Sequence, residues 1–194
     1  MERTMDIDID FADRTRALQL FKHTPARIQN RKHNTGIYFH RVPVDPFKNI
    51  CTLDHKLADN AEYFKLDLLN VTIYKDVVDE AHLHRLMNQE PIWELLQHDE
   101  FVGKLFHVSE HMDVLKKLKP DSVEKLAAVL AIIRPAKRYL VNHTWDTIFN
   151  EVWVKPETDQ YFFKKSHAFS YSVAVVVHMN LLCEQMMQTK ELGQ

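Results

Sequence analysis

The sequence predicts an α+β fold in which a small sheet near the start of the chain is covered on one face by helices, with a helical C-terminal half. Two observations predict this class. Apolar and charged residues alternate in segments of the first part of the chain, which is typical of strands, and apolar residues recur at helical spacing through most of the remainder. A length of 194 residues leaves room for one domain with a substantial core, so we expect a single domain over residues 1–194.

Three segments predict the strands. Residues 6–11 alternate strictly, which places Asp6, Asp8 and Asp10 on one face of a strand and the apolar side chains on the other. Residues 36–42 predict a second strand. Residues 62–71 predict a third, with Lys65 and Asp67 on the face opposite to its apolar residues.

Helical spacing predicts helices over residues 12–23, 77–87, 92–97, 110–118 and 144–153. Asp121, with Glu124 three residues later, predicts the cap of a further helix that ends near Pro135. Residues 166–187 predict a long, largely buried terminal helix. Lys165 and Ser166 would precede it, where they could either bind phosphate or simply cap and solvate the helix.

The composition is that of a globular protein, with 45% hydrophobic and 27% charged residues. A net charge of −2 excludes the global basic field that drives non-specific nucleic-acid binding. Cys51 and Cys183 match no zinc or redox spacing, and the apolar stretch 171–182 is short and interrupted by polar residues. We therefore expect a cytoplasmic protein that does not enter a membrane.

The aspartates are the residues that could carry chemistry. An Asp-x-Asp pair on one strand, Asp8 and Asp10, with a third aspartate on a neighbouring strand, Asp67, is the arrangement that a two-metal phosphoryl-transfer site needs. Lys65 on the same face could neutralise phosphate charge. Taken alone, the row of aspartates also fits a solvated strand edge.

Five segments, in this order along the chain, resemble motifs of one enzyme family: R-T-M-D-I-D-I-D-F at 3–11, R-K-H-N-T-G-I at 31–37, F-K-L-D-L-L at 64–69, L-K-P-D-S at 118–122 leading to R-P at 134–135, and K-S-H-A at 165–168. In these segments the chain resembles the catalytic palm domain of the C-family bacterial DNA polymerase III alpha subunit, in a much shortened form.

The resemblance implies a polymerase-beta-like nucleotidyltransferase palm that adds nucleotides from dNTPs to the 3′-hydroxyl of a DNA primer–template, in a bacterial or phage-infected cell. It implies Mg²⁺, with Mn²⁺ as a substitute, held by Asp8, Asp10 and Asp67. It also implies that the nucleotide or its phosphates lie near Lys32, His33, Lys65, Arg134, Lys165, Ser166 and His167.

The chain departs from the family pattern in substrate handling. The Gly-Ser element that cradles the triphosphate in the family has no counterpart here, and the family's R-P-G-P turn reads R-P-A-K at 134–137. We therefore expect a second protein to supply triphosphate binding or DNA grip. Two alternatives stay open: a non-catalytic palm-like module that docks on a replication or transcription partner, and a transferase that uses a non-DNA acceptor.

Overall fold

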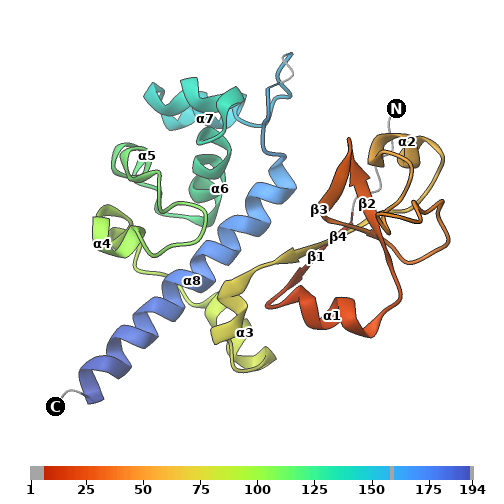
Figure 1. Cartoon of the computed structure of the whole chain (residues 1–194). Helices are drawn as coiled ribbons and strands as arrows, with labels where there is room; N and C mark the ends of the chain where they lie inside the picture. The colour runs from red at the N-terminus through yellow and green to blue at the C-terminus, as the bar shows by residue number, and fades with distance from the viewer. Residues whose placement is uncertain (1–6, 158–159, 193–194) are drawn as a thin grey trace. The chain divides into compact units, whose positions relative to one another are not determined.

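The computed structural model describes residues 7–157 and 160–192. The chain divides into two compact units, residues 1–75 and 76–194, and each is described by itself. The predicted α+β class is confirmed, since the first unit contains a four-stranded mixed sheet and the elements described in the second are helical (Figure 1). The expectation of a single domain stays a prediction.

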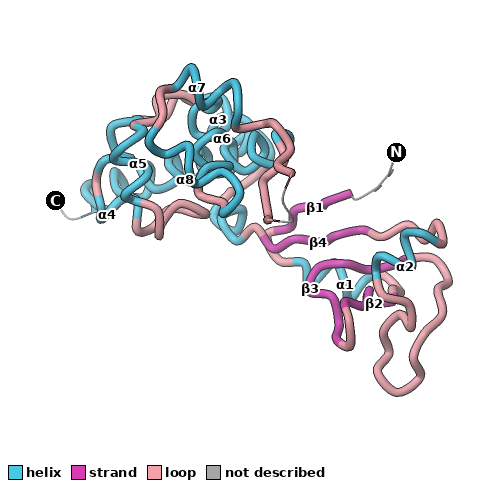
Figure 2. The backbone as a smooth tube through the Cα atoms, turned by 90° about the horizontal axis from the view of Figure 1, so that it is seen from above, coloured by secondary structure: helices cyan, strands magenta, loops and turns pink. Residues whose placement is uncertain are grey.

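The sheet of the first unit has the strand order β1-β4-β3-β2. Its edge strand β1 runs parallel to β4, whereas β3 is antiparallel to both β4 and β2 (Figure 2). The strands span Ile7–Phe11 (β1), Thr24–Ile28 (β2), Arg31–Tyr38 (β3) and Leu66–Asn70 (β4).

Two of the three predicted strands are found within their expected ranges, as β1 and β4, although Asp6 lies outside the described residues. The expected strand 36–42 is wrong in its bounds, because β3 begins at Arg31 and ends at Tyr38. Strand β2 was not predicted, since Pro25 and Arg27 interrupt its apolar pattern. It forms as the hairpin partner of β3, across a turn in which Gln29 takes a φ of 54°.

Helix α1 (Arg14–Leu20) confirms the helix predicted over 12–23. Its Ala17 and Leu18 line an apolar cavity together with Ile9 of β1 and Leu68 of β4, so α1 lies over the apolar face of the sheet. The short helix α2 (His55–Asn60) begins after Asp54, whose side chain accepts a hydrogen bond from the amide of Lys56. Ala58 of α2 belongs to a small core with Ala26, Tyr38 and Cys51.

The second unit is built around α6, which is buried from Leu126 to Ile132 and packs along the terminal helix α8 (Figures 1 and 2). Its helices span Glu80–Asn88 (α3), Asp99–Val102 (α4), Met112–Leu118 (α5), Val123–Ile132 (α6), Trp145–Glu151 (α7) and Lys165–Leu192 (α8). Three 3₁₀ segments complete the described elements: Thr72–Asp76 (η1), Trp93–Gln97 (η2) and Pro135–Asn142 (η3).

Three details of the predicted helices need correction. Ser122 rather than Asp121 caps α6: its hydroxyl accepts the amide of Lys125 at 3.3 Å, while Asp121 forms an ion pair with the Lys125 side chain. Residues 93–97 form a 3₁₀ segment instead of an α-helix. Helix α8 begins at Lys165, so Lys165 and Ser166 lie in its first turn and do not precede it.

One described helix, over Lys165–Thr189, is long and apolar enough to cross a membrane by length and composition alone, with a mean hydropathy of 1.2. However, 56% of its most apolar window is buried inside the protein, as in the core helix of a soluble protein.

Candidate acidic site on the sheet

The carboxylates of the first unit share one face of the sheet. Asp8 of β1 is the register partner of Asp67 in β4, and Gly36 of β3 is the partner of Asp67 on its other side. Paired residues on neighbouring strands project to the same face, and the strands lie about 4.8 Å apart. Asp10 follows two residues after Asp8 and therefore lies on this face as well.

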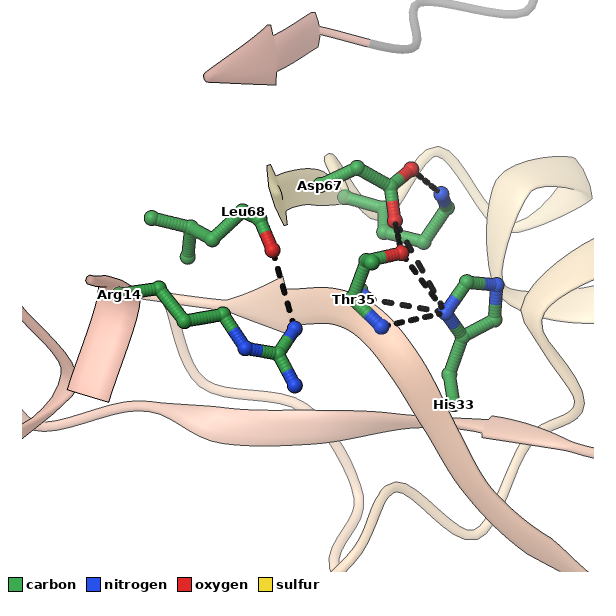
Figure 3. Close-up of polar contacts among 7 residues, drawn as sticks. Arg14, His33, Thr35, Asp67 and Leu68 are labelled. Atoms are coloured by element: carbon green, nitrogen blue, oxygen red, sulfur yellow. Dashed lines mark hydrogen bonds and ion pairs between the residues drawn. The ribbon is translucent and has the colours of Figure 1, made fainter. Parts of the chain in front are cut away.

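Asp67 is buried, with 8% of its surface exposed, and its two carboxylate oxygens are both engaged. The Thr35 hydroxyl donates a hydrogen bond of 2.6 Å to Oδ1, and Lys65 forms an ion pair with Oδ2 (Figure 3). Burial would raise the pKa of Asp67, but the hydrogen bonds from Lys65 and Thr35 and the charge of Lys65 outweigh it and hold the pKa below the ordinary value. The carboxylate is therefore ionised at neutral pH.

His33 organises the backbone beside Asp67. Its Nδ1 accepts the amide of Gly36 at 2.9 Å and that of Thr35 at 3.3 Å (Figure 3). The Nδ1 atom of His33 thus acts as the hydrogen-bond acceptor for both amides. Its Nδ1 lies 3.8 Å from Oδ1 of Asp67, which is beyond hydrogen-bond distance.

Gly36 provides the space in which Lys65 reaches Asp67. A Cβ atom at position 36 would lie 2.9 Å from Cδ of Lys65 and 3.1 Å from Cβ of Ala26. Any side chain at this position would displace the lysine or the strand. Gly36, the glycine of the segment R-K-H-N-T-G-I at 31–37, thus allows the Lys65 side chain to pass close to β3.

Asp8 and Asp10 are exposed on the edge strand. Partial burial and the neighbouring charge of Asp8 raise the pKa of Asp10. Burial and the charge of Asp10 likewise raise the pKa of Tyr74. Two like charges on adjacent face positions repel, and a bound cation would relieve the repulsion.

The metal prediction meets one specific obstacle. In residues 7–157 and 160–192, no three His, Cys, Asp or Glu side chains are arranged to hold a metal ion. The Lys65 ammonium occupies Oδ2 of Asp67 and would repel a metal ion there, so Asp67 would have to exchange the Lys65 contact before this oxygen could ligate a metal. The assignment of Asp8, Asp10 and Asp67 as metal ligands stays a prediction.

The residues predicted to bind nucleotide or phosphate are divided between the two units. Lys32, His33 and Lys65 belong to the first unit, where Lys32 is exposed on β3 and Lys65 contacts Asp67. Four others belong to the second unit: Arg134, Lys165, Ser166 and His167.

In the second unit these side chains lie against aromatic rings. The Arg134 guanidinium is 5.0 Å from the ring centre of Phe163, and the His167 ring meets the same phenylalanine edge-on at 6.2 Å. The Lys165 ammonium lies 5.8 Å from the ring centre of Phe169, and Ser166 is exposed. Arg134 and Lys165 thus each lie close to aromatic rings, and their predicted contact with phosphate stays untested.

Two functional candidates, Thr35 and Tyr74, were missed by sequence reasoning. Thr35 sits between His33 and Gly36 in a segment whose strand was expected to begin one residue later, so its hydroxyl had no predicted neighbour. Tyr74 lies in a 3₁₀ segment, η1, and no apolar periodicity in the sequence predicts that segment.

No protein-family model matches the chain, and neither a curated protein nor a solved structure matches it.

Proposed function

We propose that this protein is a two-metal nucleotidyltransferase of the polymerase-beta-like palm type, which adds nucleotides to the 3′-hydroxyl of a DNA primer. The observation that supports the proposal best is the strand register that sets Asp8 beside Asp67, with Asp10 on the same face. An Asp-x-Asp strand next to a third aspartate is the arrangement such chemistry requires. The five ordered segments that resemble C-family polymerases support the same function.

The metal would be Mg²⁺, with Mn²⁺ as a substitute, held by Asp8, Asp10 and Asp67. When bound there, such ions lower the pKa of an attacking hydroxyl and neutralise charge on the triphosphate. The exposed carboxylates and the raised pKa of Asp10 fit this role, because a divalent cation stabilises adjacent anions.

Lys65 is the residue whose contacts would have to change. In the structure it neutralises Asp67. In the proposed function its ammonium turns to a phosphate oxygen of the nucleotide and leaves Oδ2 of Asp67 open. Thr35 keeps hold of Oδ1, and the His33 ring keeps the backbone at Thr35 and Gly36 in place.

The contacts that Asp67 makes with Lys65 and Thr35 also favour a second candidate. This is a non-catalytic palm-like module that acts by docking on a replication or transcription partner. The Lys65 ammonium compensates the charge of Asp67 without any cation, and Thr35 satisfies its other oxygen. A buried ion pair of this kind can serve the fold alone.

Primer extension tests the two candidates. Purified protein is incubated at low salt with a labelled primer–template, all four dNTPs and Mg²⁺ or Mn²⁺. We expect extension by the wild type and a loss of at least about a hundredfold in the doubly substituted Asp8→Asn, Asp10→Asn variant. Asp59→Asn, an exposed aspartate on α2, is the matched control and should retain full activity.

Mn²⁺ binding, followed by electron paramagnetic resonance on the same variants, separates the outcomes. Binding that Asp8→Asn, Asp10→Asn removes, without extension, would point to a missing partner or a different acceptor. If neither extension nor site-specific Mn²⁺ binding occurs, the catalytic assignment is wrong and the docking module is the better reading.

A further inference from the structure

The net charge of the whole chain is close to neutral, but one segment contains an excess of basic residues. Between Asp13 and Asp45 the sequence contains no Asp or Glu, and it contains seven Lys and Arg residues: Arg14, Arg16, Lys22, Arg27, Arg31, Lys32 and Arg41. This segment folds as α1 and the β2–β3 hairpin of the first unit. The excess therefore belongs to one region of the fold, where it can act on a ligand.

Some of these charges are used by the fold and others are not. Arg14 donates to the carbonyl of Leu68 at 2.9 Å, and Arg27 donates to that of Thr52 at 3.0 Å. In contrast, Lys22 and Arg41 are exposed, and neither pairs with a carboxylate among the described residues. These two cations remain available to an anionic ligand.

Lys22 and Arg41 line the same cavity, at the end of the β2–β3 hairpin away from its turn. This basic cleft has a volume of about 430 Å³, and its other lining residues include His23, Phe39 and His40. The described acidic residues contribute nothing to its lining. Its chemistry suits a phosphate group.

A second cavity adjoins the basic cleft, because Phe39 lines both. This apolar cavity has a volume of about 300 Å³ and lies on the sheet face opposite to the aspartates, under α1. Phe21 and Phe39 are 57% and 45% exposed, and their rings meet edge-on with centres 5.9 Å apart. Exposed aromatic rings beside basic side chains are how proteins bind unpaired bases.

We propose that these two adjoining cavities bind single-stranded nucleic acid, with phosphates at Lys22 and Arg41 and a base against Phe39 and Phe21. A nucleotide unit has one anionic and one flat apolar part, which matches a basic cleft joined to an apolar one. A base inside a duplex has both faces covered by its neighbours, so the apolar cavity selects an unstacked base. This binding requires neither the carboxylates of Asp8 and Asp10 nor a metal, and it goes beyond the proposed transferase activity.

Fluorescence anisotropy of a labelled oligothymidylate tests the proposal with the full-length chain, in EDTA and at low salt. The presence of EDTA makes the result independent of metal-dependent catalysis. We expect binding by the wild type that weakens with salt. Lys22→Gln combined with Arg41→Gln should weaken it about tenfold and flatten the plot of log affinity against log salt by about 0.7 per lost phosphate contact.

Phe39→Leu, which keeps an apolar side chain but removes the ring, should weaken binding about fivefold or more. Lys56→Gln on α2 removes one positive charge outside the cleft, half of what the double variant removes, and should change affinity by less than about twofold. All four positions are exposed, and thermal melting checks that each variant is folded.

Three results would overturn the proposal. The wild type does not bind the oligonucleotide; Lys56→Gln weakens binding as much as the substitutions in the cleft; or a duplex of the same length binds equally well and Phe39→Leu has no effect. The last result would leave only non-specific attraction to a polyanion.

Discussion

Asp67 shows how one buried carboxylate is accommodated by its neighbours. Sequence reasoning placed it among like charges, which repel. In the structure a lysine two residues earlier and a threonine from β3 offset that repulsion and the cost of burial. Removing the carboxylate would leave the Lys65 ammonium largely buried without this partner, and such a loss is costly.

Asp67→Asn should therefore lower the free energy of unfolding at pH 7 by about 3 kcal/mol, as measured by urea denaturation. The folded pKa of Asp67 lies below the unfolded value, so its stabilisation is present above about pH 4 and is lost as the pH falls through the folded pKa. The difference between wild type and variant should accordingly shrink at acid pH. A more stable variant at pH 7 would mean that repulsion among the aspartates outweighs the ion pair.

At the scale of elements, local chemistry decides where helices begin and pairing decides where strands form. Helix α6 starts where a hydroxyl can accept an amide of the first turn, and Ser122 has the extended backbone that this requires. Strand β2 has a poor strand pattern of its own and exists because β3 supplies its hydrogen bonds.

Ser122→Ala should destabilise the protein by about 1 kcal/mol in thermal or urea unfolding, because an amide at the start of α6 loses its acceptor. Asp121→Ala is the matched comparison one residue away. It removes only an exposed ion pair with Lys125, and its effect should be much smaller. The reverse order of effects would restore Asp121 as the cap.

At the scale of the whole molecule, charge and apolar surface are distributed unevenly along the chain. The basic excess lies in the first unit, while the large apolar core lies in the second, around α6 and α8. In this core α8 contributes residues that are almost fully buried, such as Val175, Val176 and Met179. Packing on α6 covers these residues of α8.

Leu130→Ala, at a fully buried position of α6, should lower the free energy of unfolding by about 2–5 kcal/mol in urea without detergent. Met187→Ala lies on α8 where the side chain is 56% exposed, and it should cost less than about 0.5 kcal/mol. Equal effects would show that the contact between α6 and α8 does not form the core in solution.

The sequence by itself determined the α+β class, strands β1 and β4, most of the longer helices and the shared face of Asp8 and Asp10. The reason is that the face of a side chain follows from a local period of two along a strand or 3.6 along a helix. The same rule placed Lys65 and Asp67 together.

Only the tertiary structure decided which residues contact these charged side chains. The partnership of Thr35 with Asp67 joins residues 32 positions apart, and the alignment of Asp8 with Asp67 depends on a register that no local pattern contains. The cleft beside Phe39 likewise forms only when the hairpin brings Lys22 and Arg41 together. Periodicity assigns a side chain to a face, but its partners are set by the pairing of distant strands.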